Sequence, residues 1–271
     1  MTTRRGHPPV LKRLGQHFLY DDKVLQGIAD AVAPLPEETV IEIGPGRGAL
    51  TDILASRKNP LTAIEIDHAL SDQLRARYAA NPRVTIVEAD VLQTDIAALA
   101  NGPYVVAGNV PYYITTPILF HVLRAPYPRH AVFLVQLEVA QRIVAPPGSR
   151  TYGALSVNVQ AVASAEIVFE VPRGAFKPPP KVTSALVRIT PRPDPIVEPA
   201  DAAKFRSFVQ GLFGMRRKQI GNALRSVSDL TTHQVAEVLA KLEIDPRARP
   251  ETLSPEVQAT LMKAVRSLLV V

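Results

Sequence analysis

Short runs of β-prone apolar residues alternate with amphipathic stretches from residue 39 to residue 143, and this alternation restricts the possible folds more than any other feature. The runs predict strands over residues 39–43, 61–66, 84–87, 104–108 and 131–135. The intervening stretches predict helices over residues 49–56, 69–78, 117–123 and 137–143, after an earlier helix over 21–33. Strands that alternate with helices of this length predict a mostly parallel sheet with helices on both faces. Residues 165–171 and 184–189 are further strand candidates at one edge, which makes a seven-stranded α/β fold.

A proline-rich segment then ends the alternation. Residues 191, 193, 195 and 199 are all proline, and proline fits neither a helix interior nor a central strand. Only helices are predicted after it, over residues 200–212, 217–226, 232–241 and 255–269. We therefore expect a basic arm without regular structure over 1–20, a catalytic α/β domain over 21–190, a linker over 191–199 and a small all-α domain over 200–271.

Composition excludes several classes of protein. Apolar residues make up 46% and charged residues 21% of the 271 positions, which is typical of a globular chain with a large core. The sequence has no cysteine, so it can form neither disulfides nor thiolate metal sites. No apolar stretch resembles a signal peptide or reaches the ~18 residues of a membrane span. We expect a cytoplasmic protein.

Positive charge is concentrated at the two ends of the chain. Residues 1–23 carry five Lys or Arg against two Asp, and residues 201–271 carry 11 basic against 7 acidic side chains. The middle, residues 24–200, is nearly neutral with 15 against 16. Two basic ends suit a polyanion such as nucleic acid, although solubilising surface charge gives a similar excess in many proteins.

A glycine-rich loop joins the first strand to its helix. Residues 42–48 read Glu-Ile-Gly-Pro-Gly-Arg-Gly. Alternate glycines such as Gly44 and Gly46 let the backbone turn sharply and approach a ligand. The G-x-G-x-G spacing differs from the G-x-G-x-x-G of dinucleotide binders, and Glu42 is unfavourable beside a pyrophosphate but tolerable beside a cation. We therefore expect a cationic ligand such as a methionine sulfonium; a purely structural turn is the alternative.

Acidic residues follow the next two predicted strands. Glu65 stands at the end of the second strand, where a carboxylate commonly accepts from a ribose diol, and Asp67 is its competitor for that role. Asp90 follows the third strand and could accept from an adenine amino group. Either acid could instead be a solvated loop carboxylate. Together with the glycine loop and Asn109, however, they predict one nucleoside-bearing ligand across four strand ends.

The fourth strand ends in Asn109-Val110-Pro111-Tyr112. The Asn109 side chain and the Pro111 carbonyl offer two hydrogen-bond acceptors, and Tyr112 adds a flat aromatic face. This combination suits a planar ring that carries an amino group. The alternative is a strand end followed by a turn, with Tyr112 in the core.

Taken together, these motifs resemble the ribosomal RNA adenine N6,N6-dimethyltransferases, and the chain is most similar to the small-subunit enzymes of that family. The resemblance runs from about residue 14 to the C-terminus and includes Gln-His-Phe-Leu at 16–19, the glycine loop, Glu65, Asp90 and the Asn-Val-Pro-Tyr tetrad. Three further segments support it, namely V-Q-x-E-V-A-x-R at 135–142, F-x-P-x-P-x-V-x-S at 176–184 and Phe-Gly-Met-Arg-Arg-Lys at 213–218.

The resemblance implies a Rossmann-like fold and S-adenosylmethionine as methyl donor. It implies two adjacent adenines, in a hairpin loop near the 3′ end of small-subunit rRNA, as acceptors. Donor-binding positions fall on His17, Leu19, Gly44, Gly46, Glu65, Asp90 and Asn109. The chain departs from the family at His17, where Asn is most frequent, so that a backbone contact is more secure there than a side-chain contact. It departs again at Val110, where small-subunit enzymes usually have Leu and large-subunit enzymes Ile, so this residue favours neither.

Methyl transfer to adenine requires a well-oriented amino nitrogen rather than a strong base. We expect Asn109 and Pro111 to accept its two N–H bonds, Tyr112 to stack on the base and Phe176 to close the other face. The alternative for Phe176 is a structural plug under the proline loop. RNA contacts are expected from Arg4, Arg5, Lys12 and Arg13 and from Arg216, Arg217 and Lys218.

Four functions remain open from the sequence. The first is dimethylation of small-subunit rRNA by a monomeric enzyme with a role in subunit biogenesis, and the second is the same chemistry on large-subunit rRNA. The third is an RNA-binding ribosome-assembly factor in which methylation is secondary. The fourth, a nicotinamide-dependent oxidoreductase, is disfavoured by the glycine spacing. No metal site is expected.

Overall fold

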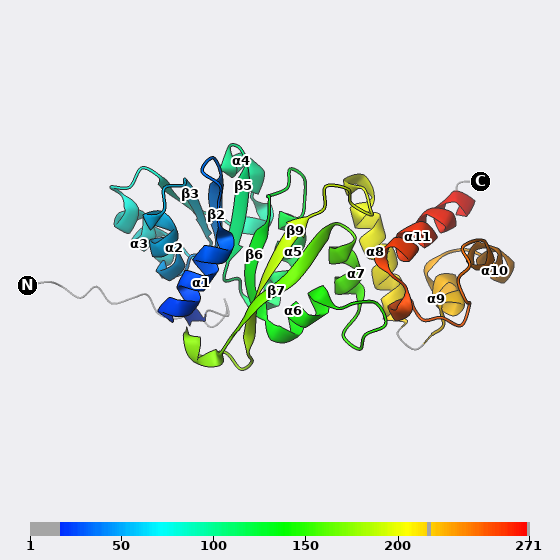
Figure 1. Ribbon diagram of the computed structural model, residues 1–271. Helices are drawn as coiled ribbons and strands as arrows, with labels where there is room; N and C mark the ends of the chain where they lie inside the picture. Colours follow the sequence, from blue (N-terminus) through cyan, green and yellow to red (C-terminus); the bar gives the residue numbers. More distant parts are fainter. Residues whose placement is uncertain (1–16, 216–217, 270–271) are drawn as a thin grey trace, which may run out of the picture. The chain divides into compact units, whose positions relative to one another are not determined.

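The computed structural model describes residues 17–215 and 218–269 (Figure 1). Within them, seven strands form one sheet in the order β4-β3-β2-β5-β6-β9-β7. The strands are β2 (Thr39–Ile43), β3 (Leu61–Glu65), β4 (Val84–Glu88), β5 (Tyr104–Gly108), β6 (Ala131–Gln136), β7 (Ala163–Val171) and β9 (Ser184–Pro191). Strands β2 to β6 are parallel, and β9 runs antiparallel to β6. The predicted seven-stranded, mostly parallel α/β fold is confirmed, with the β9–β7 pair at one edge.

Strand register brings the polar strand ends to one edge of the sheet. Ile43 of β2 lies opposite Gly108 of β5 and next to Ile64 of β3, while Glu65 of β3 lies opposite Glu88 of β4. Because these strands are parallel, their carboxyl ends open toward the same side. Ligands bind at such an edge in open α/β sheets.

Five of the six helices described around this sheet match the predicted amphipathic stretches closely, and the exception is Ile96–Ala100. The six helices are α1 (Asp22–Val32), α2 (Ala49–Ser56), α3 (His68–Tyr78), α4 (Ile96–Ala100), α5 (Thr115–Val122) and α6 (Leu137–Val144). Asp21 caps α1 by accepting from the backbone N–H groups of Lys23 and Val24, as a helix N-terminus requires. Apolar residues of α1 and α2 share a buried core with Val105 of β5 and Val132 of β6.

Two short strands and one short helix were not predicted. Phe18–Leu19 forms a two-residue strand, β1, that pairs antiparallel with β8 (Phe176–Lys177). The expectation that residues up to 20 lack regular structure is therefore wrong at Phe18–Leu19, because this segment finds a distant partner strand. The five-residue helix α4 is capped by Asp95 and is too short to show a helical period.

Contacts between residues divide the chain into two compact units. The first runs to Ala140 and includes Glu166–Pro191, and the second comprises Gln141–Ala165 and the chain from Arg192 onward. The second unit contains α7 (Ala154–Gln160), α8 (Ala202–Gly214), α9 (Ile220–Val227), α10 (Thr232–Lys241) and α11 (Pro255–Leu269).

Helix α7 was not predicted, and it shares a core with α8 in the second unit. Val157 and Ala161 pack with Phe205 and Val209 there. The division at residues 191–199 that the sequence suggested remains a prediction, and the 141–165 segment packs with the helices that follow that linker. In the part of the chain that the structure describes, no helix is long and apolar enough to cross a membrane.

Candidate functional site

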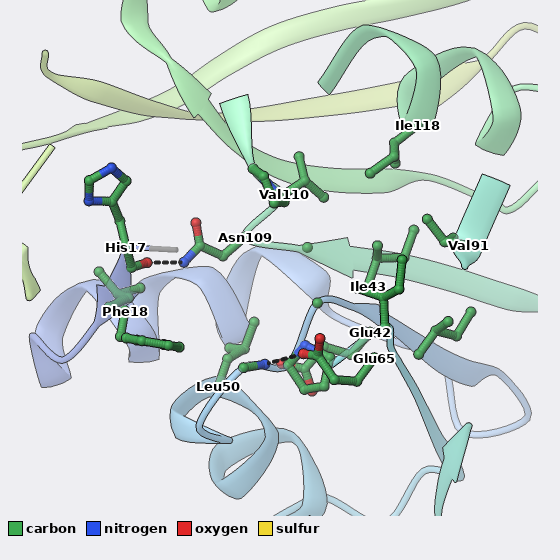
Figure 2. Close-up of a pocket in the computed structure, with 18 of the residues that line it drawn as sticks. His17, Phe18, Glu42, Ile43, Leu50, Glu65, Val91, Asn109, Val110 and Ile118 are labelled. Atoms are coloured by element: carbon green, nitrogen blue, oxygen red, sulfur yellow. Dashed lines mark hydrogen bonds between the residues drawn. The ribbon is translucent and has the colours of Figure 1, made fainter. Parts of the chain in front are cut away.

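A pocket opens at the carboxyl ends of strands β2, β3 and β5, and beyond β4 (Figure 2). Its lining includes Glu42 within β2, Gly44 just after β2, Glu65 at the end of β3, Asp90 beyond β4 and Asn109 directly after β5. The pocket therefore brings together the strand-end residues that the sequence singled out. His17, Leu19, Gly46, Pro111 and Tyr112 also line it.

The glycine loop forms one wall of this pocket. Gly44 and Gly46 have φ angles of 68° and 57°, in the left-handed region that favours glycine. The Gly46 N–H donates to Glu65 Oε2 at 3.0 Å. A side chain at Gly46 would lie 3.2 Å from the ring of Phe18, so the loop packs closely under β1. The Arg47 guanidinium in turn lies 4.2 Å from the centroid of the Phe18 ring, a cation–π contact.

Two of the four acidic and polar residues are buried carboxylates. Glu42 and Glu65 are 2% and 5% exposed. Burial raises the pKa of Glu42 to about 8; the nearby Thr51 hydroxyl opposes the rise, and the carboxylates of Glu65 and Asp52 add to it. Burial also raises the pKa of Glu65, against the hydrogen bonds it accepts from the backbone N–H groups of Asp67 and Gly46. The pocket thus holds two acids in an environment that disfavours their charge.

The two other acids of this region have backbone roles. Asp67 caps α3 by accepting from the N–H groups of Ala69 and Leu70, so Glu65 and not Asp67 is the acid that lines the pocket. Asp90 accepts from the Leu92 N–H at 2.9 Å and from the Gln93 side chain at 3.3 Å. Asp90 therefore stabilises its own turn while it lines the pocket.

Asn109 is oriented by the segment that precedes β1. Its side-chain nitrogen donates to the His17 carbonyl at 3.2 Å, as Figure 2 shows. This hydrogen bond leaves the Oδ1 atom as the acceptor that Asn109 offers to a ligand. His17 contributes its backbone carbonyl to this hydrogen bond. The contact therefore does not depend on the side chain at position 17, where the family usually has Asn. The His17 ring itself lies 2.9 Å from the Pro178 carbonyl, through Nδ1.

The second acceptor is not where the sequence placed it. The Pro111 carbonyl, predicted to be free, accepts from the Ile114 N–H at 3.1 Å and from the Thr115 hydroxyl at 3.3 Å. These bonds occupy both of its lone pairs because Pro111 begins the 3₁₀ turn Tyr112–Ile114. The Val110 carbonyl accepts no hydrogen bond within the described residues, and Val110 lines the pocket. The Val110 carbonyl is therefore the candidate for a second acceptor in place of the Pro111 carbonyl.

Tyr112 is held in a fixed position beside Asn109. Its hydroxyl lies 2.7 Å from that of Ser184 on β9, and its ring stacks against His17 with centroids 6.0 Å apart and planes at 25°. Tyr112 thus lines the pocket with its aromatic ring, while its hydroxyl is held by Ser184.

Phe176 does not face the pocket. It is 2% exposed, pairs with Leu19 across the β1–β8 ladder and packs in the buried core with Leu25 and Val171. The role of covering the second face of the base is therefore not supported, because the ring is directed into apolar surroundings. The alternative, a plug under the proline loop, fits this burial.

Among the apolar residues of the pocket lining that sequence reasoning did not single out are Ile66 and Val91. Ile66 is 57% exposed directly after Glu65, and Val91 directly follows Asp90. Both are large apolar side chains beside an acid at a strand end, a pattern that suits the flat faces of a nucleoside. In the sequence they look like ordinary strand or turn residues.

The predicted RNA-binding residues lie almost entirely outside the described chain. Arg4, Arg5, Lys12, Arg13, Arg216 and Arg217 are not described, and Lys218 is exposed. Their role stays a prediction.

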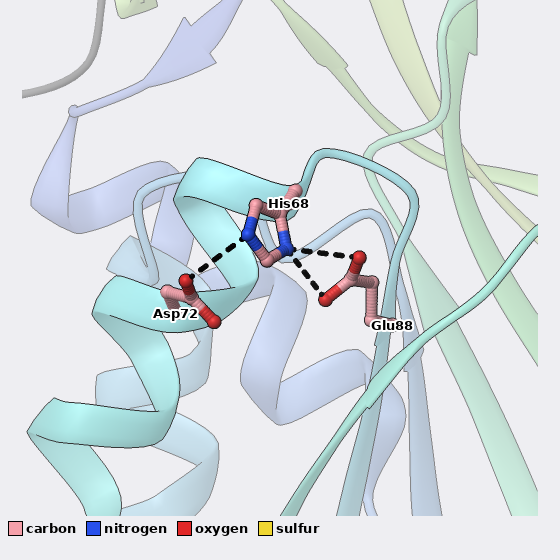
Figure 3. Close-up of side chains that lie close together, drawn as sticks. All are labelled: His68, Asp72 and Glu88. Atoms are coloured by element: carbon pink, nitrogen blue, oxygen red, sulfur yellow. Dashed lines mark hydrogen bonds and ion pairs between the residues drawn. The ribbon is translucent and has the colours of Figure 1, made fainter.

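A cluster of His68, Asp72 and Glu88 lies on the surface near the pocket (Figure 3). The two ring nitrogens of His68 face different carboxylates: Nδ1 lies 3.0 Å from Glu88, and Nε2 lies 3.4 Å from Asp72. Arg75 also binds both acids, at 3.0 and 3.1 Å. The hydrogen bond to Glu88, followed by the charges of Asp72 and Glu88, raises the pKa of His68. These ion pairs tie α3 to β4.

Comparison with known proteins agrees with this site. Residues 10–266 match the family model described as "Ribosomal RNA adenine dimethylase". A protein of Idiomarina loihiensis named ribosomal RNA small subunit methyltransferase A is 42% identical over 254 residues, covering 93% of this chain and 86% of the relative. A Gloeobacter violaceus protein of the same name is 44% identical over 251 residues, with coverage of 91% and 90%.

Solved structures give the same result. The crystal structure of the 23S rRNA methyltransferase ErmE is 30% identical, with a TM-score of 0.71 and coverage of 92% of this chain and 99% of that chain. A dimethyladenosine transferase from Plasmodium falciparum, 23% identical with a TM-score of 0.81, covers 93% of this chain and 98% of its own and shows the same fold. The chain belongs to the ribosomal RNA adenine dimethylase family.

Proposed function

We propose that this enzyme transfers methyl groups from S-adenosylmethionine to the N6 atoms of two adjacent adenines in a hairpin loop near the 3′ end of small-subunit rRNA. The observation that carries the proposal is the geometry of Asn109. Its nitrogen is held by the His17 carbonyl, so its oxygen is presented as an acceptor next to the Val110 carbonyl and the Tyr112 ring. Two acceptors beside an aromatic face match an adenine amino group.

The residues of the pocket fit the methyl donor. A loop with left-handed Gly44 and Gly46 permits close backbone approach, and the buried Glu42 Oε2 makes no well-formed hydrogen bond among the described residues. Glu65 at the end of β3 suits a ribose diol, and Ile66 offers apolar surface beside it. His17, Leu19 and Asp90 complete the proposed donor site. When bound, S-adenosylmethionine supplies a methyl group on a sulfonium, a good leaving group.

The chain's own residues then orient the acceptor. Asn109 Oδ1 and the Val110 carbonyl each accept a hydrogen bond from one N–H group of the amino nitrogen. This arrangement favours a more pyramidal nitrogen, whose lone pair then points out of the ring plane. Tyr112 stacks on the base, a contact worth roughly 1–3 kcal/mol. Each transfer would leave the nitrogen positively charged, and it would then lose one proton to solvent. After the first transfer a single N–H remains, and one of the two acceptors still holds it, which permits a second methylation.

The partners follow from this chemistry. The substrate is small-subunit rRNA or a subunit under assembly, which implies a cytoplasmic site of action and a role in subunit biogenesis. We propose a monomer. Phosphate contacts from Arg4, Arg5, Lys12, Arg13, Arg216, Arg217 and Lys218 would bring a strong salt dependence of RNA binding.

Large-subunit rRNA is the second candidate substrate. ErmE, a 23S rRNA methyltransferase, is 30% identical to this chain, whereas the proteins named small subunit methyltransferase A reach 42% and 44%. The higher identity favours the small subunit.

Replacement of Asn109 by Ala tests the proposal. We expect Asn109→Ala to lower the rate of methyl transfer by at least 100-fold, because the amino group loses an acceptor that orients it. Affinity for RNA, measured by filter binding, should change little. Asn81→Ala is the control, since Asn81 lies ahead of β4, at the opposite end of the strands, and its side chain accepts from the Arg83 N–H. Near-parent transfer by Asn109→Ala would refute the assigned role.

A further inference from the structure

Glu42 is an acid that the proposed mechanism leaves without a chemical task. It is the fourth residue of β2, lies opposite Ala107 of β5, and is 2% exposed. Its Oε2 atom and the hydroxyl of the fully buried Thr51 on α2 make no well-formed hydrogen bond among the described residues, although the Thr51 hydroxyl still lowers the pKa of this carboxyl and so partly opposes the effect of burial. A buried carboxylate with an unsatisfied oxygen is costly when it is charged. Such an atom at the wall of a ligand pocket indicates that a ligand completes its contacts.

The charges around Glu42 are negative on two of the elements packed against it. Glu65 faces it from β3 and Asp52 from α2, and both carboxylates disfavour its ionisation. From β5 the pocket residues are Gly108 and Asn109, which carry no charge. Arg47, in the loop itself, is directed to the Phe18 ring. Without a ligand, the neutral acid is therefore the favoured form at neutral pH.

We propose that Glu42 is protonated in the ligand-free enzyme and releases this proton to solvent when the cationic methyl donor binds. The O–H bond of the carboxyl breaks, the proton passes to the buffer, and the carboxylate that remains offsets positive charge of the ligand. Binding of the donor is thus coupled to pH through one residue. This inference rests on the proposed function, because it takes S-adenosylmethionine as the ligand of the pocket.

The direction of the pH dependence follows from the pKa of about 8. Below that pH the donor must displace a proton, so its affinity should rise about tenfold per pH unit between pH 6 and 7 and level off above pH 8. At pH 7 nearly one proton should be released for each donor bound. A site with a permanently ionised Glu42 would show neither effect.

Calorimetric titration of the full chain with S-adenosylmethionine tests this coupling. The binding heat is measured at pH 7 in phosphate and in Tris, whose ionisation enthalpies differ, so that their difference gives the protons released. The Glu42→Gln variant carries a neutral isostere at this position, so its proton release measures the protons that the ligand and other groups exchange. The difference between the parent and this variant is the contribution of Glu42. We expect nearly one proton fewer for Glu42→Gln, and a flatter dependence of its dissociation constant on pH. Asp52→Asn, which removes a neighbouring charge outside the pocket lining, should retain most of the proton release, because burial and not Asp52 is the largest cause of the raised pKa of Glu42.

Three results separate the possible failures. Equal proton release by the parent and Glu42→Gln overturns the inference, and so does release that vanishes only in Glu65→Gln. If Glu42→Gln fails to fold, the absence of proton release by the parent protein alone overturns it. If the parent does not bind S-adenosylmethionine at all, the proposed function fails instead.

Discussion

At the scale of the residue, the acceptor side of the pocket depends on which atoms are already engaged. Asn109 has a donor side held by the His17 carbonyl, which leaves its oxygen available. The Pro111 carbonyl is engaged by Ile114 and Thr115, so the adjacent Val110 carbonyl takes its place as candidate acceptor. A sequence shows that a proline follows Val110, but it does not show how the following turn closes.

Phe176 gives the sharpest test at this scale, because its two possible roles predict different losses. As a core residue that is 2% exposed, it should cost about 3–5 kcal/mol of stability when it is replaced by Ala. Urea denaturation of Phe176→Ala measures this free energy. The folded fraction of the variant should methylate at a rate close to that of the parent.

Tyr112→Ala is the counterpart of this variant. Its ring is only partly buried and lines the pocket, so methyl transfer should fall while stability changes less than in Phe176→Ala. If Phe176→Ala keeps the parent stability and loses transfer, Phe176 acts on the base rather than in the core.

At the scale of the element, the strands and long helices could be predicted because their apolar pattern is local. Strands β2 and β5 and helix α2 lie over the predicted residues, and α1 lies within the predicted range 21–33. The β1–β8 ladder could not be predicted, because two residues carry no period and their partners are more than 150 positions away. Helix α4 could not be predicted either, because its five residues are too few to show a helical period.

The glycine loop permits a quantitative test of backbone strain. Gly48 and Gly148 have nearly equal φ angles, 83° and 81°, but differ in their surroundings. A Cβ at Gly48 would lie 2.8 Å from side-chain atoms of Leu74 and Arg77, whereas one at Gly148 would meet nothing within 4 Å. Gly148→Ala should therefore cost about 1–2 kcal/mol, the left-handed strain alone.

Gly48→Ala should cost more than Gly148→Ala, because buried Leu74 cannot move aside freely. Chemical denaturation of both variants gives the comparison. Equal losses would show that Leu74 and Arg77 yield to the added methyl group, and that only backbone strain matters at Gly48.

At the scale of the whole molecule, the four strand-end residues were the part of the site most accessible to sequence reasoning. Parallel strands must end at one edge, so Gly44, Glu65, Asp90 and Asn109 could be grouped from the order of the predicted strands, and all four line one pocket. The neutral state of Glu42 could not be predicted in this way. It depends on burial and on the nearby Glu65, which strand register and loop packing determine together.

The charge of the whole chain completes this picture. The positive excess lies at the two ends, whereas the nearly neutral middle supplies most of the pocket lining, apart from His17, Phe18 and Leu19. Charge at the ends suits a grip on phosphates, while the near-neutral, apolar-lined pocket suits a nucleoside and a base. The proposed RNA contacts and most of the pocket thus fall on different parts of the sequence.

The most direct test of the central claim is methylation of unmodified small ribosomal subunits by the purified protein with labelled S-adenosylmethionine, followed by mapping of the modified bases. We predict four methyl groups per subunit, as two adjacent N6,N6-dimethyladenines in a hairpin loop near the 3′ end of the rRNA. Unmodified large subunits should remain unlabelled under the same conditions. Label confined to large-subunit rRNA, or no label in either subunit by a protein that binds the donor, would contradict the claim.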